Sequence, residues 1–586
     1  MPMPATPREE LVHRGRYVAV AALLALAVPA SARAAVACDA AALGALRVPG
    51  VTVLQATPVA ALGGNPAFCS VVAAVATSGM GAPDGSATVL LDLPSGWNGK
   101  FLFFGTGGLA GVLSPSANAP DVVTALARGY ATANTDTGHQ GNGLTPADGL
   151  GKVTDGRWAL RDDGSPDEAK LADYFFRATH QATIAGKAFT SAFYGAPVRR
   201  AYFDGCSNGG RQALVEASRF PEDYDGIIAG APFFDIRIVM GGANFEKTLL
   251  RSPATYVPFQ LLPGVDRAIV ASCDAADGVA DGLIQNPGAC AFDPASLVCA
   301  GGNGAGCLTA LQAETLRAYF TALRDDDGKI LYTGAAVGDL DAFGGLDLWG
   351  VGFVPPADFA ASEPWGNLGF TPAPITWQFV DHIMKFIVAR DPAFAVRDFP
   401  ADAGVVSDAG VALFDARTAA GSARDPEAYR RFLREGRKLL LYHGYSDPAL
   451  PAFRTVRLYE ALARTQGGRH RLADGARLFM VPGMQHCGGG SGPNVFDTLS
   501  ALEAWVEQGK APDAIVAAHF QGNDPTKGID RSMPLCPFPT QATYDGKGDP
   551  TKAASWSCRP NGKLLRVGPN GVQAGLVGPL AGDDGE

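Results

Sequence analysis

The chain has 586 residues, of which 47% are hydrophobic and 18% are charged, and these proportions are typical of a globular protein with a large core. A net charge of −10 argues against nucleic acid or an anionic membrane as the main partner, because both repel an acidic surface. The 73 glycines and 42 prolines follow no fixed period, which excludes a fibre or a repeat array.

Residues 1–34 have the pattern of a secretory signal peptide. Basic residues, among them Arg14 and Arg16, precede the apolar run "YVAVAALLALAVP", and "ASARA" offers a cleavage site that ends at Ala34. The run is too short to cross a bilayer comfortably, and no later stretch is long and apolar enough. We therefore expect an exported protein, secreted or periplasmic, with a lipid anchor at Cys38 as the alternative.

All ten cysteines lie from Cys38 onward, in the part of the chain that export would carry into an oxidising compartment. They form no C-x-x-C pair, which argues against a zinc site or thioredoxin-type chemistry. Their even number predicts five disulfides, although spacing alone leaves the connectivity open.

Apolar runs that end in glycine-rich turns recur between residues 86 and 232, and a segment with helical spacing, 167–194, lies among them. Two similar runs, 437–447 and 476–487, follow much later. Alternation of strands with helices is the signature of a parallel sheet with helices on its faces. We therefore predict an α/β fold whose catalytic domain comprises residues 35–233 and 426–586.

The early loop "FFGTGGLAG", residues 103–111, follows one of these strands. It resembles the glycine-rich loop that donates a backbone N–H to the oxyanion in α/β hydrolases, and Gly107 and Gly108 are the candidate donors. A plain glycine-rich turn is the alternative.

The run "YFDGCSNGG" contains a G-x-S-x-G motif around Ser207. The motif alone carries little information, because about one residue in eight of this chain is glycine. Its context is more specific: an apolar strand precedes it and "RQALVEASRF", with helical spacing, follows. A strand, a sharp turn and a helix form a nucleophile elbow, in which the helix N-terminus offers N–H groups to an oxyanion. An ordinary serine in a glycine-rich turn is the alternative.

Residues 234–425 differ in character from the rest, with many loops and a dense set of aromatic residues in the second part. We interpret this segment as a lid inserted between two core strands. A second structural domain is the alternative.

Within this insertion, "CDAADGVADGLI" places Asp274, Asp277 and Asp281 on a tightly turning loop. Carboxylate oxygens, completed by the carbonyls of Val279 and Leu283, form a ligand set that suits Ca²⁺. A solvated acidic turn explains the same residues equally well.

A serine nucleophile needs a base, and the chain has eight histidines. In α/β hydrolases the base follows the serine and the acid, and catalytic groups gather at the carboxyl ends of strands. His486, in the loop after the strand "LFMVP", meets both conditions. Asp447, just past "LLLYHGYS", is the acid that would orient the imidazole, and His443 nearby is a substrate contact or a turn residue.

Cys206 adjoins the proposed nucleophile and Cys487 adjoins the proposed base. If Ser207 and His486 lie within hydrogen-bond reach, the two cysteines lie within disulfide distance. Two unrelated thiols would require this adjacency by coincidence. The pair therefore predicts a disulfide that clamps the elbow to the histidine loop.

Together, "GCSNGGRQAL", "HGYSDP" and "GMQHCGGG" resemble the tannase/feruloyl esterase family, which includes a hydrolase of mono(2-hydroxyethyl) terephthalate. The resemblance extends from about Cys38 to Cys558 and implies an α/β-hydrolase fold with a large inserted lid. It also implies Ser207 as nucleophile, Asp447 as acid and His486 as base, with backbone N–H groups of Asn208 and of Gly107 or Gly108, of which we assign Gly108, as oxyanion donors. The implied calcium ligands are Asp274, Asp277, Val279, Asp281 and Leu283. The implied disulfides are Cys38–Cys69, Cys206–Cys487, Cys273–Cys290, Cys299–Cys307 and Cys536–Cys558.

From these residues and this resemblance we expect a secreted serine esterase that hydrolyses aromatic acid esters, feruloyl or gallate-type, through an acyl-enzyme. A terephthalate monoester is an alternative substrate, for which Lys385 or Arg390 could pair with the distal carboxylate, although solvation at a helix surface explains both. The presence of Asn at position 208 does not by itself indicate the substrate. The terephthalate-ester hydrolase has Glu at this position. A secreted, calcium-stabilised binding protein without catalysis is the alternative from another class. The sequence does not indicate an oligomeric state.

Overall fold

The computed structural model of the chain describes residues 36–140, 153–290, 292–301, 306–338, 340, 344–365, 373–402 and 404–560. The predicted signal peptide, residues 1–34, lies outside the described residues.

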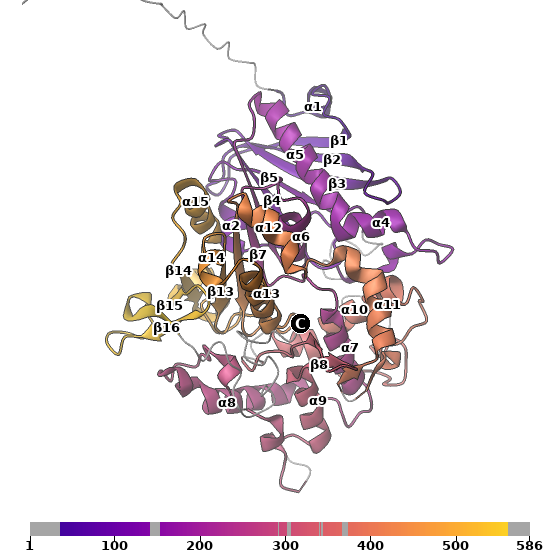
Figure 1. Cartoon of the computed structure of the whole chain (residues 1–586), viewed down its shortest axis with the longest axis vertical. Helices are drawn as coiled ribbons and strands as arrows, with labels where there is room; N and C mark the ends of the chain where they lie inside the picture. Colours follow the sequence, from indigo (N-terminus) through magenta and orange to yellow (C-terminus); the bar gives the residue numbers. More distant parts are fainter. Residues whose placement is uncertain are drawn as a thin grey trace, which may run out of the picture. The chain divides into compact units, whose positions relative to one another are not determined.

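A nine-stranded sheet forms the centre of the fold (Figure 1). Its strand order is β1-β2-β3-β5-β4-β6-β7-β12-β13, and the strands from β5 to β13 are parallel to one another. The strands are β1 (Val51–Val59), β2 (Phe68–Thr77), β3 (Gly85–Pro94), β4 (Lys100–Phe104), β5 (Ala131–Thr135), β6 (Arg200–Cys206), β7 (Gly226–Gly230), β12 (Lys438–Gly444) and β13 (Ala476–Val481). This sheet confirms the predicted α/β class.

Three strands at one end of the sheet, β1, β2 and β3, are antiparallel to their neighbours. The expectation that the apolar run at 87–94 joins a parallel sheet is therefore wrong for β3. The reason is local, because the short segment between β2 and β3 permits a hairpin but not the crossover helix that a parallel pair needs.

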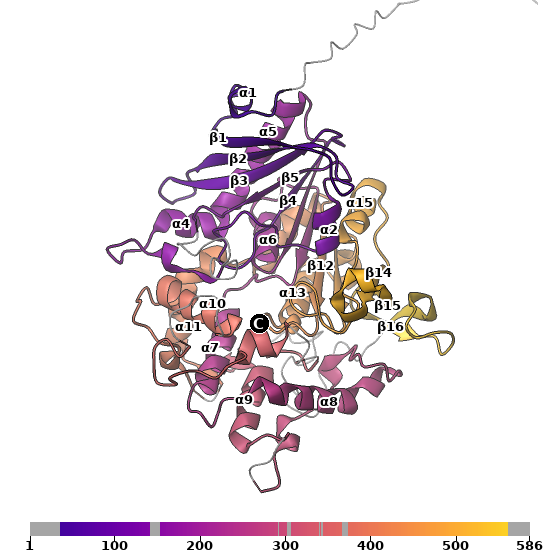
Figure 2. The ribbon, with the colours of Figure 1, turned by 180° about the vertical axis from the view of Figure 1, so that it is seen from behind.

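Helices cover both faces of the sheet, because successive side chains of each strand point to opposite faces. Phe101 and Phe103 of β4 pack on one face with α5 (Ala178–Tyr194), α6 (Asn208–Arg219) and α13 (Ala452–Thr465). Leu102 and Phe104 pack on the other face with α15 (Thr498–Gln508). Figure 2 shows this arrangement from behind. Shorter helices flank this layer: α1 (Ala40–Gly44), α2 (Ala119–Thr124), α4 (Glu168–Ala172), α12 (Arg430–Arg434) and α14 (Arg469–Leu472).

The insertion at 234–425 contains helices and a separate four-stranded sheet of order β10-β11-β8-β9. Its elements are α7 (Ile238–Leu249), α8 (Leu262–Cys273), α9 (Ala310–Phe320), β8 (Leu323–Asp325), β9 (Ile330–Tyr332), α10 (Ile375–His382), β10 (Ala401–Asp402), β11 (Val405–Val406) and α11 (Asp408–Thr418). Side chains of α7 and α10 share one apolar cluster with Leu109, Trp158 and Leu450, which lie outside the insertion. The insertion is therefore packed against the residues that follow the ends of β4 and β12.

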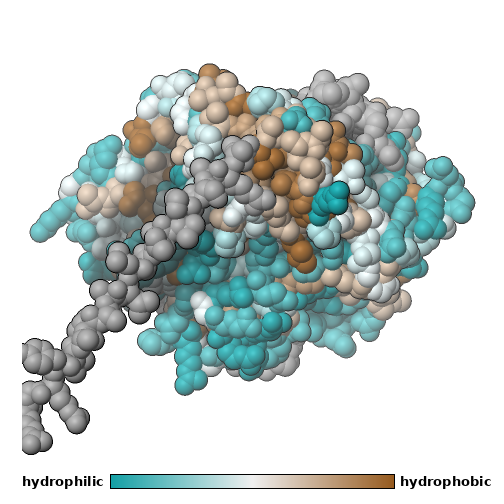
Figure 3. Space-filling view, turned by 90° about the horizontal axis from the view of Figure 1, so that it is seen from above, coloured by the Kyte–Doolittle hydropathy of each residue, from teal (hydrophilic) through white to brown (hydrophobic). Residues whose placement is uncertain are grey.

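The chain continues into two further two-stranded sheets, formed by β14 (Ile515–Phe520) with β15 (Ile529–Leu535) and by β16 (Thr540–Tyr544) with β17 (Trp556–Pro560). Five disulfides join the ten cysteines in the pairs that the family resemblance implies. Within the described residues, no helix has the length and apolar character needed to cross a membrane. Figure 3 shows the end of the molecule that carries α1 and β1, where apolar residues gather in the upper and middle part of the view and polar residues cover the lower part.

Candidate active site

Ser207 lies at the turn between β6 and α6, in a backbone conformation that L-residues rarely adopt, with φ of 63° and ψ of −124°. The flanking glycines permit this turn. A Cβ at Gly205 would lie 2.4 Å from the carbonyl oxygen of Gly209, and a Cβ at Gly209 would lie 2.7 Å from that of Ser116. The sequence G-x-S-x-G therefore forms a strained elbow between strand and helix, as the sequence predicts.

Asp447 and His486 lie together after β12 and β13. His486 Nδ1 is 2.8 Å from Asp447 Oδ2. The other carboxylate oxygen accepts hydrogen bonds from the backbone N–H groups of Ala449, at 2.8 Å, and Leu450, at 2.9 Å. Burial opposes ionisation of Asp447, but the neighbouring His486 and the hydrogen bonds from His443 and His486 hold its pKa below the ordinary value. The carboxylate is therefore ionised and fixed in orientation.

His443 has a role that neither of the two sequence interpretations anticipated. It is a buried residue of β12, and its Nε2 lies 3.1 Å from Asp447 Oδ2 while its Nδ1 lies 2.8 Å from Thr455 Oγ1. It is therefore neither a turn residue nor one of the residues that line the pocket. Sequence reasoning missed this contact because it depends on α13 bringing Thr455 back against the strand.

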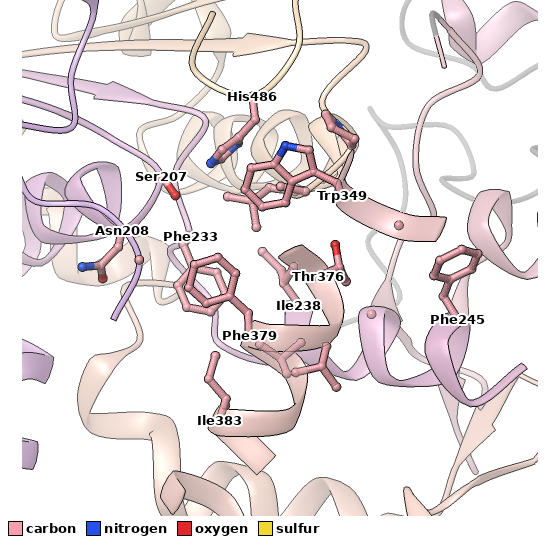
Figure 4. Close-up of a pocket in the computed structure, with 18 of the residues that line it drawn as sticks. Ser207, Asn208, Phe233, Ile238, Phe245, Trp349, Thr376, Phe379, Ile383 and His486 are labelled. Carbon is pink, nitrogen blue, oxygen red and sulfur yellow. The ribbon is translucent and has the colours of Figure 1, made fainter. Parts of the chain in front are cut away.

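Ser207 and His486 line the same pocket, and the imidazole of His486 points toward the hydroxyl of Ser207 (Figure 4). The predicted clamp is present beside them, with a Cα–Cα distance of 5.9 Å between Cys206 and Cys487. It joins residues 281 positions apart in the sequence. The elbow and the histidine loop are thus covalently linked next to the pocket.

The predicted oxyanion donors also meet at this pocket, since Gly108 and Asn208 both line it. Gly108 lies in the turn that follows β4, and Asn208 is the first residue of α6. Of the two glycines that the sequence left open, Gly108 is the one that lines the pocket. Their backbone N–H groups come from two chain segments, the turn after β4 and the first turn of α6.

The pocket spans about 750 Å³ including the solvent at its open side, and its wall is mainly apolar. Most of the wall comes from the insertion: Ile238, Val239, Phe245, Tyr319, Tyr332, Trp349, Phe379, Val380 and Ile383. The Trp349 ring meets His486 edge-on at 5.0 Å, and Phe379 lies nearly parallel to Trp349 at 6.4 Å. No charged side chain is found among the described residues that line this space.

The two cations considered for a distal carboxylate are occupied elsewhere. Lys385 is 3% exposed, and its Nζ pairs with Asp381 at 2.8 Å and with Glu363. Arg390 pairs with Glu168 at 3.2 Å. Neither residue lines the pocket, so their assignment to a substrate carboxylate is not supported, and the surface interpretation of Lys385 is wrong because the residue is buried.

The acidic loop after α8 presents oxygen atoms of a kind that fits Ca²⁺. Burial and the negative charges of Asp281 and Asp274 raise the pKa of Asp277 to about 6, while hydrogen bonds from the backbone N–H groups of Val279 and Gln285 oppose this rise. Arg531 of β15 pairs with Asp281 at 2.6 Å and balances part of this charge. The donor atoms are of the kind that Ca²⁺ prefers, but the carboxylate oxygens of the three aspartates do not all lie within 4.8 Å of one another.

Another set of ligand-type side chains, His180, Glu216 and Asp223, lies on the α5 and α6 side of the sheet. Among the described residues, this is the set of three whose ligand atoms all lie within 4.8 Å of one another. His180 Nδ1 is 2.6 Å from Asp223 Oδ2, and Lys187 Nζ is 3.4 Å from Asp223 Oδ1. Burial and the proximity of Asp223 raise the pKa of Glu216 well above its ordinary value, which favours its neutral form. These contacts balance the cluster without a metal, and we assign none to it.

The sheet order, the elbow after β6 and the acid and histidine after β12 and β13 define the chain as an α/β hydrolase. The model of the family described as tannase and feruloyl esterase matches residues 69–352 and 381–559. The chain therefore belongs to the tannase and feruloyl esterase family.

Relatives in this family are similar over most of their length. A mono(2-hydroxyethyl) terephthalate hydrolase of Piscinibacter sakaiensis is 32% identical over 84% of this chain and 85% of its own. A probable feruloyl esterase of Arthroderma benhamiae is 31% identical, also over 84% of this chain and 85% of its own. The crystal structure of an esterase from Aspergillus oryzae superposes with a TM-score of 0.69, at 25% identity, over 87% of this chain and 97% of that one.

Proposed function

We propose that the protein is an exported serine esterase that hydrolyses uncharged aromatic acid esters through an acyl-enzyme. The observation that carries this proposal is the placement of Ser207 and His486 in one apolar pocket, with Asp447 hydrogen-bonded to His486. The five disulfides support export, because disulfides persist in oxidising compartments.

In the proposed reaction, His486 removes the hydroxyl proton of Ser207 as Oγ attacks the ester carbonyl carbon. Asp447 holds the imidazole and stabilises its positive charge. The N–H groups of Asn208 and Gly108 donate hydrogen bonds to the oxyanion of the tetrahedral intermediate. His486 then returns the proton to the departing alcohol, and a water molecule, activated by the same imidazole, hydrolyses the acyl-enzyme to release the acid and Ser207.

The residues that line the pocket also indicate which acyl group the protein prefers. A terephthalate monoester carries a carboxylate, and burying that charge without a cationic partner is costly. The described lining offers no such partner, and Lys385 and Arg390 are paired elsewhere. A galloyl group would bury three hydroxyls against a mainly apolar wall. A feruloyl group, with one hydroxyl and one methoxy, fits this lining best.

Ca²⁺ is proposed as a structural ion on the loop that follows α8. Its ligands would be the carboxylates of Asp274, Asp277 and Asp281 with the carbonyl oxygens of Val279 and Leu283. The ion would hold this loop in place and would supply no step of the ester hydrolysis.

The decisive experiment replaces Ser207 by Ala. We expect S207A to lose at least about 10⁴-fold in kcat on methyl ferulate, because nucleophile and base act as one unit. The control is S218A, since Ser218 lies on the same helix α6 and bonds only to backbone carbonyls of that helix. A wild-type protein without serine-dependent turnover would favour a calcium-stabilised binding protein instead. Comparison of kcat/KM for methyl ferulate, methyl gallate and the terephthalate monoester tests the acyl preference.

A further inference from the structure

The two segments that carry the proposed oxyanion donors meet in direct backbone contact. A Cβ at Gly105, which precedes the donor loop, would lie 2.5 Å from the Cα of Gly209 in the first turn of α6. No side chain can therefore separate the loop from the helix. The relative position of the two segments must be set by hydrogen bonds around this contact.

Three of these hydrogen bonds involve the backbone of Thr106. Its backbone N–H donates to Oε1 of Gln212 at 3.2 Å, and its carbonyl oxygen accepts from Nε2 of Gln212 at 3.0 Å. The same carbonyl accepts from Nδ2 of Asn208 at 2.9 Å. All three residues are at most 2% exposed, so water does not compete with these bonds. The side-chain amide of Gln212 thus bonds to both the N–H and the carbonyl of Thr106, as the backbone of a neighbouring strand would.

A second set of contacts connects the same segments. Arg211 donates from Nε to Oδ1 of Asn208 at 2.7 Å and from a terminal nitrogen to the carbonyl of Tyr174 at 2.8 Å. The hydroxyl of Tyr174 donates to the carbonyl of Gly108 at 3.2 Å. The residues that offer the two oxyanion N–H groups are therefore connected by two separate paths.

We propose that Gln212 is a positioning residue that sets the spacing between the oxyanion N–H groups of Gly108 and Asn208. This inference depends on the proposed function. Gln212 does not itself line the pocket, so it acts through Thr106, two residues before Gly108. Oxyanion donors act when they lie about 2.7–3.1 Å from the position of the oxyanion. A small shift of the loop therefore weakens the stabilisation of the transition state, while substrate binding changes little.

The replacement Gln212→Glu tests this role through pH. A protonated carboxylic acid reproduces both bonds, because one oxygen accepts from Thr106 N–H and the hydroxyl donates to the Thr106 carbonyl. A carboxylate instead places a lone pair against that carbonyl oxygen. We expect kcat of Q212E to approach the wild-type value at the low end of the active pH range and to fall about tenfold or more below it as pH rises. KM should stay within about twofold.

Two further variants separate positioning from folding. Q212A should lose about 10- to 100-fold in kcat at every pH, with a similar loss of affinity for an arylboronic acid, whose serine adduct is tetrahedral. N98D is the matched control, because Asn98 forms the same kind of two-point clamp at the other end of β4, accepting from Lys100 N–H and donating to the Arg128 carbonyl, both at 2.8 Å. N98D should keep the wild-type kcat and pH profile.

The outcomes separate this inference from the proposed function. Wild-type turnover that depends on Ser207, together with wild-type kcat and pH profile for Q212E, would overturn the role of Gln212 alone. Equal losses of kcat in Q212A and N98D, accompanied by equal falls in melting temperature, would also overturn it. Absence of serine-dependent turnover in the wild type would overturn both.

Discussion

At the scale of single residues, two buried carboxyl groups near the β6–α6 elbow are unusual. Asp204 precedes Ser207 in β6, Asp121 belongs to α2, and both are fully buried. Asp121 accepts hydrogen bonds from the Thr498 hydroxyl and from Leu499 N–H. Burial raises the pKa of Asp121 to about 7, and burial together with the charge of Asp121 raises the pKa of Asp204 well above its ordinary value. At least one of the two is therefore protonated in the folded protein at mildly acidic pH.

This pair predicts a pH dependence of stability. Between about pH 4 and pH 7 the folded state retains a proton that the unfolded chain releases, so stability falls as pH rises through this window. The variant D121N cannot release that proton. Its melting temperature should fall less than that of the wild type between pH 5 and pH 8, by about 2 °C or more, in differential scanning calorimetry. Equal falls in the two proteins would contradict this assignment.

At the scale of elements, the Cys206–Cys487 disulfide joins the β6–α6 elbow to the loop after β13. Ser207 and Cys487 both have φ of 63°, so both chain segments depart from ordinary backbone geometry where the disulfide holds them. Strain of this kind persists only when surrounding contacts enforce it. The disulfide is the covalent contact common to both segments.

Removal of this disulfide should therefore lower kcat more than removal of another disulfide does. We expect the C206S/C487S double variant to lose about 100-fold or more in kcat, because a displacement of about 1 Å between nucleophile and base costs that much. The control is C536S/C558S, whose disulfide joins the residue that follows β15 to β17. It should lower the melting temperature and leave kcat nearly unchanged. A near-normal rate in the first variant would refute the clamp.

Much of the sheet is predictable from sequence because β4, β6, β7, β12 and β13 are buried on both faces and appear as continuous apolar runs. The strand β1 escapes such reasoning because its exposed side chains, including Leu54, interrupt any pattern. The positions of Ser207, Asp447 and His486 follow from the rule that site residues gather at strand ends. The contacts of His443 and Gln212 do not, because each depends on a partner more than ten positions away in the chain.

At the scale of the whole molecule, the acidic loop connects the insertion to the two-stranded sheets formed by β14 to β17. Arg531 of β15 bonds to both the carboxylate and the carbonyl of Asp281, each at 2.6 Å. Leu283 belongs to the same small apolar cluster as Met533 and Trp556. A calcium ion on this loop would stabilise contacts between segments about 250 residues apart.

Calcium removal should therefore lower the melting temperature of the whole protein, as loss of any ligand bound to the native state does. We expect chelation with EGTA to lower it by several degrees and added Ca²⁺ to restore it. D277N should melt at the lower temperature with or without the ion. D327N, in another acidic turn where Asp327 is exposed, is the control and should respond like the wild type. The absence of any calcium effect on the wild type would exclude the site.

The edge-on contact between Trp349 and His486 has a consequence for how this enzyme could diversify. One indole ring forms part of the pocket wall and also contacts His486, the proposed catalytic base. A replacement of Trp349 that suits a different acyl group would alter the seating of the imidazole at the same time. A change of acyl preference at Trp349 is therefore expected to change kcat as well, and a second substitution near His486 would be needed to restore it.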